Sequence, residues 1–391
     1  MASISSSIFG IDHARVRYMR VFDNNLLVTS ETDGAPLVCF DADTLERKWE
    51  YKGVGTAKKV YDQPMPDIHP EAGHFSSPVY CLGHKKIVCL ESKGLHKDFC
   101  ADYRLIMHVI SLEDGSCIAK SGLDEVPNFR AIHVLGERIF RYTPYKSNAI
   151  EEVSLEGQKI REITFNYSVL YGINGFNGPF VGHSKQYESS EGYPVIGKLD
   201  SNHFNSYTTL TELEQLAFRI SEVFIDRHYL ILHISSKKNK ITAQIGTADL
   251  NSDKSFERHL ITEEVDFRET DLCPIGSMAR NANLVYFTKL NTLFAYDLNA
   301  KKTQTLDYKI QSTTIQTLFT TDQFLIGATP SKDCANIFIR SEIRIWSLKD
   351  HSVLQTIREH FLQQVHYTGK KLIALIDWKS LKAYDLPEAE L

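Results

Sequence analysis

Apolar and polar residues alternate along most of this 391-residue chain, in short segments separated by turn-forming residues. The clearest example is Leu37–Tyr51, where two alternating segments, Leu37–Asp41 and Arg47–Tyr51, flank a turn that contains Thr44. Period-two alternation on both sides of such a turn predicts an antiparallel β-hairpin with one buried face.

Related hairpins recur to the end of the chain. In each hairpin the anchor is the residue that directly follows the first strand. The eight anchors are Ala42, Leu112, Leu155, Leu199, Leu250, Leu298, Leu348 and Leu386. The first interval is 70 residues and the others are 38 to 51 residues. Asp or Ser, which start turns readily, precedes seven of the eight anchors. Repeats of roughly 40 to 50 residues are typical of four-stranded propeller blades.

Each repeat is predicted to contain four strands, and in the first repeat the strands before the hairpin are Val16–Phe22 and Asn25–Ser30. The sixth repeat is expected to begin within Val265–Ile275. The eighth has only three predicted strands before Leu391, and the spare apolar segment Ile4–Ile11 is expected to supply its fourth. An unpaired edge would otherwise remain. The sequence thus predicts one all-β propeller domain over residues 1–391, with eight four-stranded blades closed by the N-terminal strand, or alternatively seven blades.

The first hairpin resembles the tryptophan-docking repeat of quinoprotein-like propellers, which reads Ala-x-Asp-x-x-Thr-Gly-x-x-x-Trp. Asp41, Thr44 and Trp49 match this pattern, whereas Cys39 and Leu45 replace its Ala and Gly. A second resemblance, to WD repeats, rests on the segment 345–347, Ile-Trp-Ser. Both resemblances imply a propeller, and the docking repeat implies that Trp49 packs against a neighbouring blade. The motif is a packing device and carries no chemistry.

Composition places the chain among ordinary globular proteins, with 42% hydrophobic and 24% charged residues. A net charge of −5 gives no basic footprint, so nucleic acid is not expected as a partner. No signal peptide and no run of about 18 apolar residues is recognised, and no membrane partner is expected. Seven cysteines without a Cys-x-x-Cys pair predict free thiols in a cytoplasmic protein.

Candidate chemistry is sparse. Cys81, His84, Cys89, His96 and Cys100 have short spacings of the kind that a zinc site requires, but one site would need both ends of a hairpin. Buried cysteines and exposed histidines are the competing interpretation, which we favour. The quinone-dependent members of the resembled family use adjacent cysteines, and this chain has none. We therefore expect no catalytic residue, metal or cofactor, and no enzyme activity.

Glu151 and Glu152 are adjacent acidic residues, a combination that could in principle act as an acid–base pair. Neighbouring residues on a strand point to opposite faces, so the two carboxylates cannot converge on one substrate atom. We interpret them as solvated residues at a sheet edge.

The functional prediction depends on loop lengths. Turns between the first and second strands are tight, whereas longer excursions such as Lys52–Ser76 and Ser92–Tyr103 are expected on the other face. Loops that carry function are often held on a rigid scaffold in this way. The sequence predicts a non-catalytic scaffold that binds protein partners. The alternatives are a subunit clamped in a larger complex and, third, an enzyme or sugar-binding propeller. Candidate contact residues are Tyr61, Asp62, His69, Phe75 and His96.

Overall fold

The fold is all-β in the part of the chain that the structure, a computed structural model, describes. The described residues are 2–4, 8–9, 15–30, 35–52, 79–93, 104–122, 131–142, 149–164, 168–172, 180–184, 193–199, 204–206, 218–226, 229–236, 240–241, 243–249, 257–260, 265–266, 277–289, 292–307, 317–329 and 341–388. They form eight four-stranded antiparallel sheets and one two-stranded sheet. The four-stranded sheets, numbered here in chain order, fall into two compact units.

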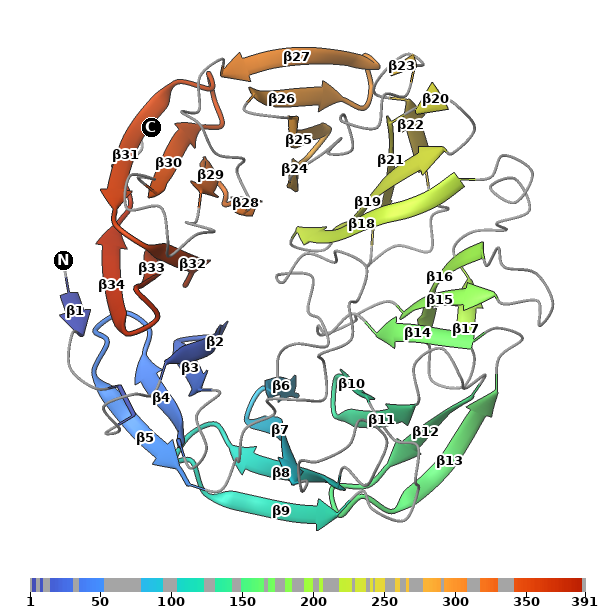
Figure 1. Ribbon diagram of the computed structural model, residues 1–391, viewed down its shortest axis with the longest axis vertical. Helices are drawn as coiled ribbons and strands as arrows, with labels where there is room; N and C mark the ends of the chain where they lie inside the picture. Colours follow the sequence, from blue (N-terminus) through green and yellow to red (C-terminus); the bar gives the residue numbers. More distant parts are fainter. Residues whose placement is uncertain are drawn as a thin grey trace. The chain divides into compact units, whose positions relative to one another are not determined.

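The first unit holds sheets 1 to 4 (Figure 1). Sheet 1 contains β2 (Val16–Phe22), β3 (Asn25–Ser30), β4 (Leu37–Asp41) and β5 (Arg47–Tyr51). Sheet 2 contains β6 (Val79–Leu82), β7 (Lys86–Lys93), β8 (Arg104–Ser111) and β9 (Cys117–Gly122). Sheet 3 contains β10 (Ala131–Leu135), β11 (Arg138–Tyr142), β12 (Ala149–Val153) and β13 (Lys159–Thr164). Sheet 4 contains β14 (Ser168–Gly172), β15 (Phe180–Ser184), β16 (Tyr193–Leu199) and β17 (Phe204–Ser206).

The second unit holds sheets 5 to 8. Sheet 5 contains β18 (Phe218–Asp226), β19 (Tyr229–Ser236), β21 (Ala243–Asp249) and β22 (Glu257–Leu260). Sheet 6 contains β24 (Met278–Asn281), β25 (Leu284–Lys289), β26 (Thr292–Asp297) and β27 (Lys302–Asp307). Sheet 7 contains β28 (Thr317–Thr320), β29 (Phe324–Thr329), β30 (Ser341–Ser347) and β31 (Val353–Glu359). Sheet 8 contains β32 (Leu362–Tyr367), β33 (Lys371–Ile376), β34 (Ser380–Asp385) and β1 (Ala2–Ile4).

Two predicted strand positions differ from the structure. The first strand of sheet 6 is β24, Met278–Asn281, and lies outside the predicted Val265–Ile275. That region contributes only β23 (Val265–Asp266), which pairs with β20 (Lys240–Ile241) in the two-stranded sheet. The strand was missed because it has no run of β-branched residues. The fourth strand of sheet 8 is N-terminal as predicted, but it covers Ala2–Ile4 rather than Ile4–Ile11.

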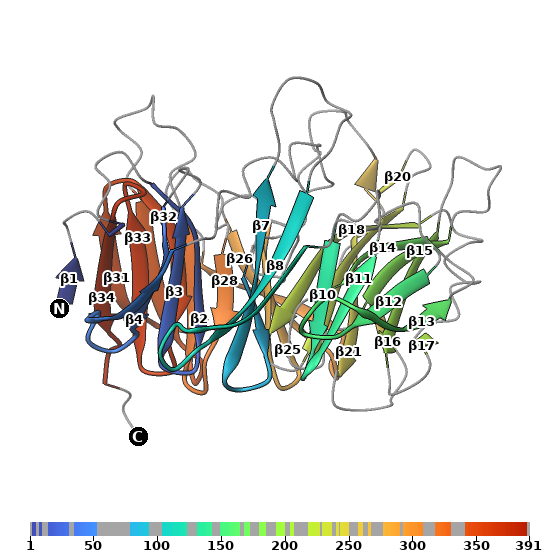
Figure 2. The ribbon, with the colours of Figure 1, turned by 90° about the horizontal axis from the view of Figure 1, so that it is seen from below.

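The anchor positions of the repeat have a common structural role. The backbone N–H groups of Ala42, Leu112, Leu298 and Leu348 donate to the carbonyl oxygens of Asn24, Lys85, Asn283 and Gln323, at 2.8 to 3.1 Å. Each bond joins the turn after the third strand to the turn between the first and second strands. These two turns therefore lie at the same end of sheets 1, 2, 6 and 7, and Figure 2 shows turns of this kind at the lower end.

The turn after the third strand of sheet 1 shows how Leu45 can stand where the docking-repeat pattern has Gly. The Asp41 carboxylate accepts hydrogen bonds from the backbone N–H groups of Asp43 and Thr44, both at 2.9 Å. Leu45 then has a φ of 61°, in the left-handed region that glycine adopts without strain. Gly115, in the corresponding turn of sheet 2, has a φ of 74°. The backbone geometry that favours Gly in the pattern is thus kept here by a leucine.

Trp49 docks on sheet 2, which confirms the packing predicted from the motif. Its indole Nε1–H donates to the Leu112 carbonyl oxygen at 3.0 Å, and the side chain is buried. A Cβ atom added to Gly115 would lie only 2.7 Å from the indole ring. The ring therefore rests directly on the glycine of the neighbouring turn, in an apolar cluster that includes Cys39 and Cys89.

Polar contacts also join neighbouring sheets in the second unit. The buried Asp226 carboxylate accepts hydrogen bonds from the Arg280 backbone N–H and, at 2.9 Å, from the Thr320 hydroxyl, so it connects sheets 5, 6 and 7. Tyr286 of sheet 6 and His351 of sheet 7 form a hydrogen bond of 3.1 Å. Neighbouring sheets are thus held by specific polar pairs in addition to their apolar cores.

Candidate interaction surface

The five contact residues predicted from loop length, Tyr61, Asp62, His69, Phe75 and His96, lie outside the described residues. Their proposed role stays a prediction. The loops that carry them begin after β5 and β7, at Tyr51 and Lys93.

The hairpin with the cysteine and histidine cluster has the predicted form. Cys81 and Cys89 lie on β6 and β7, in register with Ile87 and Val79 respectively, and His84 lies in the turn. The Cys81 thiol lies 2.9 Å from the Gly83 carbonyl oxygen, and burial raises its pKa to about 11. Cys89 is fully buried, which raises its pKa further. Within the described ranges no group of three Cys, His, Asp or Glu side chains could hold a metal ion, while His96 and Cys100 lie outside them.

The fourth strands carry the apolar side chains that face solvent. Among the described residues, the exposed large hydrophobic side chains are Ile118 of β9, Ile160 of β13, and Val353 and Leu354 of β31. Ile160 is the most exposed, at 60%. Within each unit the fourth strands lie on the outer side in Figure 1. Solvent-exposed apolar residues therefore occur at one kind of position in the fold.

Three of these four residues occupy a repeated β-bulge. In sheet 2, Ile110 pairs with Cys117 and Val109 with Ala119, so Ile118 has no partner in the register. The same shift leaves out Ile160 in sheet 3 and Leu354 in sheet 7. A bulge adds one residue to the edge strand and re-aims its side chain. Below, "bulge residues" denotes Ile118, Ile160 and Leu354.

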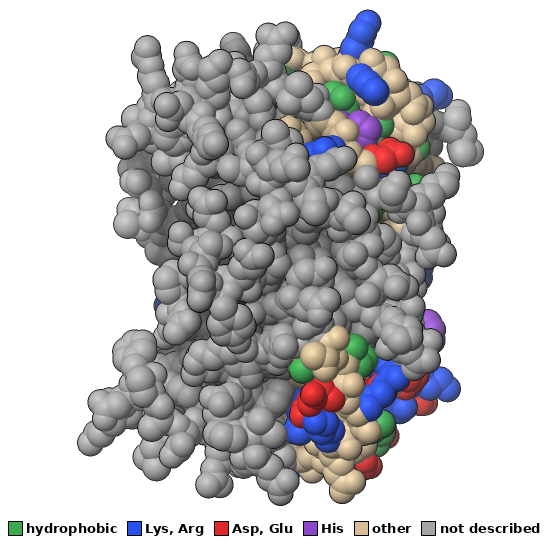
Figure 3. All heavy atoms as spheres, turned by 90° about the vertical axis from the view of Figure 1, so that its right-hand side faces the viewer, with side chains coloured by type: hydrophobic (Ala, Val, Ile, Leu, Met, Phe, Trp, Pro, Cys, Tyr) green, Lys and Arg blue, Asp and Glu red, His purple; other side chains and the backbone are tan. Residues whose placement is uncertain are grey.

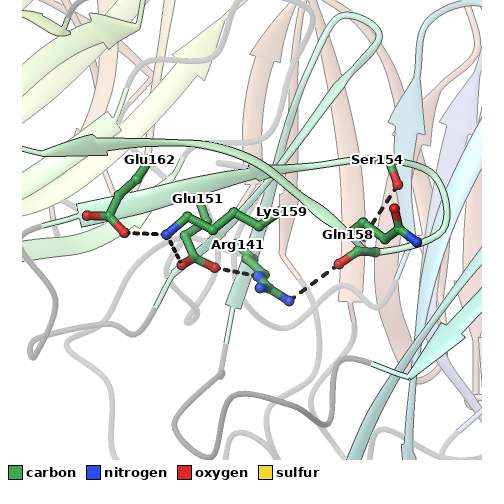
Figure 4. A network of polar contacts seen from close by, with 7 residues as sticks. Arg141, Glu151, Ser154, Gln158, Lys159 and Glu162 are labelled. Atoms are coloured by element: carbon green, nitrogen blue, oxygen red, sulfur yellow. Dashed lines mark hydrogen bonds and ion pairs between the residues drawn. The ribbon is translucent and has the colours of Figure 1, made fainter.

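Sheet 3 surrounds its bulge residue with ion pairs on both faces. On one face, Glu151 receives hydrogen bonds or ion pairs from Arg141 at 2.7 Å and Lys159 at 2.9 Å, and Lys159 also contacts Glu162 (Figure 4). On the other face, Glu152 accepts two hydrogen bonds of 2.8 Å from Arg138 and an ion pair of 2.6 Å from Arg161. Each Glu is thus held by one cation from β11 and one from β13, the two strands beside it.

The interpretation of Glu151 and Glu152 as solvated edge residues is therefore wrong in part. They do point to opposite faces, but both side chains are largely buried, with 19% and 12% exposed. Burial alone would raise the pKa of Glu151, yet hydrogen bonds from Lys159 and Arg141 outweigh it and lower the pKa. Hydrogen bonding from Arg138 lowers the pKa of Glu152 against the opposing effect of burial. Both carboxylates are structural ion-pair partners.

The resulting surface mixes three kinds of side chain. In the lower part of Figure 3, at the height of β12 and β13 in Figure 1, basic, acidic and apolar side chains lie side by side. Along β13 the sequence places Ile160 directly beside Lys159 and Arg161, and Glu162 follows them. Contact surfaces for proteins combine apolar and charged groups in this manner. Among the described residues there is also no helix long and apolar enough to cross a lipid bilayer.

Neither a family model nor a curated protein sequence matches the chain. Solved structures do. BamB from Moraxella catarrhalis is 10% identical with a TM-score of 0.51, over 99% of each chain. The dihydro-heme d1 dehydrogenase NirN, in complex with DHE, is 8% identical with a TM-score of 0.53, over 92% of this chain and 69% of that one. The β-propeller domain of Cps50 (Swd1) from Myceliophteria thermophila is 10% identical over 98% of this chain and 100% of that one, but its TM-score of 0.42 is too low to support an argument.

The chain therefore has a β-propeller fold, as the sequence predicted, and this fold is similar to those of BamB and NirN. The described residues form eight four-stranded antiparallel sheets, the number of blades that the sequence predicted, but the blade count itself stays a prediction. Closure of the blades into one ring stays a prediction. At 8% and 10% identity the likeness defines the fold alone, so function must be argued from this chain's own residues.

Proposed function

We propose that this protein is a non-catalytic scaffold for protein–protein interaction in a cytosol. The observation that carries the proposal is the repeated exposure of an apolar side chain at the edge-strand bulge, in Ile118, Ile160 and Leu354. Each is held on a rigid sheet. Because these side chains are 43 to 60% exposed, a partner that covers one of them gains roughly half of the 1.5 to 3 kcal/mol that burying a fully exposed side chain contributes.

The charged side chains around Ile160 suit a partner that carries an acidic group next to an apolar one. Lys159 and Arg161 flank the bulge, and their present carboxylate partners, Glu151 and Glu152, are held deeper in the sheet. An approaching protein with an acidic group beside an apolar one would complement this arrangement. Complementary charges of this kind contribute chiefly to specificity and to the rate of association.

The electrostatics of the described residues support a structural role for the ionisable groups. Shifted pKa values occur at functional sites, but structural ion-pair networks also produce them. Here the lowered pKa values of Glu151 and Glu152 accompany ion pairs within sheet 3. Likewise, the Glu359 carboxylate of sheet 7 accepts hydrogen bonds from Lys382 and Tyr384 of sheet 8, which lower its pKa despite burial. These partners give each carboxylate a reason to be ionised without catalysis.

The proposal is tested by capture of partners from native lysate with the tagged full-length chain. The first variant carries Ile118→Thr and Ile160→Thr, which keep β-branched side chains on the strands but remove apolar surface. A second variant carries Leu354→Thr, at the equivalent bulge of sheet 7, and a matched control carries Lys48→Thr, the polar residue that the same register shift leaves out in sheet 1. We expect the bulge-residue variants to lose specific partners and the Lys48→Thr control to retain them, all with unchanged melting, since exposed substitutions usually shift stability by about 0.5 kcal/mol or less.

A third variant, with Tyr61→Ala and His69→Ala, tests the predicted loop surface in the same experiment. Loss of partners from this variant alone would place the contact on the loops and remove the bulge residues from the proposal. A fourth variant, with Arg227→Ala and Lys370→Ala near the tight turns, tests the alternative that the protein is a subunit clamped in a larger complex. Equal loss from loop, bulge and turn variants would favour that second function, because a clamped blade assembly is contacted on several sides.

A further inference from the structure

Sheet 8 is the one four-stranded sheet of the described residues that combines strands from two distant parts of the chain. Its strands β32, β33 and β34 follow one another, whereas β1, beside β34 in Figure 1, precedes every other strand in the sequence. Sheets 1 to 7 each take their four strands from one continuous segment. From Ile4 the chain continues into the compact unit of sheets 1 to 4. The strand that completes sheet 8 therefore comes from a segment that otherwise leads into a different unit.

The place beside β34 is formed by residues outside β1. Sheet 8 packs on sheet 7 through an apolar cluster that draws on β32, β33 and β34. Two side chains of β34 are also held by Glu359 of sheet 7. The Lys382 ammonium donates to both carboxylate oxygens of Glu359, at 2.8 and 2.9 Å, and the buried Tyr384 hydroxyl donates to one of them. These contacts fix β34 whichever strand lies on its other side.

The strand β34 is regular over its whole length. Its six residues pair with β33 in a single register, from Asp385 opposite Lys371 to Ser380 opposite Ile376, and no bulge interrupts them. The edge of a regular strand presents N–H and C=O groups with which another strand can pair. Addition of a strand to such an edge is a recurrent mode of recognition. The β34 edge is therefore a template for an extended segment, unlike the bulged fourth strands described above.

We propose that the β34 edge also binds the strand Ala2–Ile4 of a second copy of this chain, so that two copies exchange β1. The structure defines the occupant, because the same edge binds this strand within one chain. An exchanged strand makes the pairing of the strand that it replaces, so swapping is a low-cost route to a dimer. The single chain is favoured by its tether, since only 11 residues separate β1 from β2. A short tether gives an effective concentration on the order of 1 mM, so exchange requires concentrated protein or copies that fold together.

The first test refolds two differently tagged populations of the full-length chain together from urea, at low and at near-millimolar concentration. Light scattering after size-exclusion chromatography gives the mass, and capture through one tag detects the other. We expect dimers that carry both tags, and we expect their fraction to rise with concentration. The matched variant carries Ser3→Pro and Ile4→Pro, which removes the N–H donor toward β34 whichever of the two residues supplies it. Its dimer fraction should be about tenfold lower; a monomer under all conditions, or an equal dimer fraction in the variant, would overturn the proposal.

A second test supplies the strand as a separate molecule. A variant that lacks Met1–Ile11 is heated with a synthetic peptide of residues 1–11, and a peptide with both proline substitutions is the control. Because a ligand that binds only the folded state stabilises it, the melting temperature should rise with the concentration of the first peptide and not with the second. An equal response to both peptides, or to neither, would refute docking at β34. The variant with Ile118→Thr and Ile160→Thr should exchange β1 like the wild type, so this result is independent of the proposed function.

Discussion

Replacing Trp49 measures how strongly sheet 1 is docked on sheet 2. Trp49 is buried, donates a hydrogen bond to Leu112 and rests on Gly115. Truncation of a buried aromatic side chain to Ala typically costs about 3 to 5 kcal/mol. We expect Trp49→Ala to lower the free energy of unfolding by about that amount. Trp49→Phe should cost less, because most of the apolar ring remains and only a hydrogen bond worth about 1 kcal/mol is lost.

The contact with Gly115 makes the measurement specific. Gly115→Ala places a Cβ atom 2.7 Å from the indole and also forces a side chain to adopt a φ of 74°. The overpacking costs about 1 to 3 kcal/mol, whereas the backbone strain costs roughly 1 to 2 kcal/mol. Only the overpacking should vanish in a Trp49→Ala background, so the two substitutions should be coupled.

The assay is urea unfolding of the four proteins of this cycle, followed by far-ultraviolet circular dichroism. The docking would be refuted by a loss of less than about 1 kcal/mol in Trp49→Ala. It would also be refuted by an equal cost of Gly115→Ala in both backgrounds, because the indole would then not contact the glycine.

Three further outcomes are expected. Burial lowers the pKa of His351 below its usual 6.5, so the unfolded chain binds the proton first and stability should fall as pH decreases below about 6.5. His351→Asn, which tolerates the positive φ at this position, should weaken the pH dependence of the urea midpoint between pH 7.5 and 5.5. An unchanged slope of the midpoint against pH would contradict this expectation. Deletion of Met1–Ile11 should lower the melting temperature of the whole chain, because it removes the strand beside β34, and a shift of only a degree or two would argue against this role. Purified protein should carry no stoichiometric zinc by elemental analysis, and one zinc per chain that is lost on replacing Cys81 or Cys89 would reverse that expectation.

The strands of sheet 1 could be predicted to the residue because their pattern is local. Val16–Phe22, Asn25–Ser30, Leu37–Asp41 and Arg47–Tyr51 were all confirmed with the bounds read from the sequence. Alternation identifies the buried face, and Asp or Gly marks each turn. The strand Met278–Asn281 lacked these signals and was placed too early, since Ala and Arg carry little strand preference.

The surface features could not be predicted in the same way, because they depend on the register between strands. The partners of Glu152 come from β11 and β13, 14 and 9 residues away in the sequence, respectively. Only the pairing of those strands brings Arg138 and Arg161 to one carboxylate. The bulge residues left a faint signal, since Cys117-Ile118-Ala119 interrupts the alternation of β9, but such a break alone does not show which side chain faces solvent.

The repeated bulge also limits how a partner can bind. A regular edge strand offers an uninterrupted row of backbone N–H and C=O groups, to which another chain can add a strand. At Ile118, Ile160 and Leu354 the extra residue bends that row close to the start of the edge strand. An incoming strand could therefore not continue the sheet past this point in register. Recognition at these edges must depend on the side chains, which favours a folded partner over an extended peptide and protects the sheets from stacking edge to edge into fibrils.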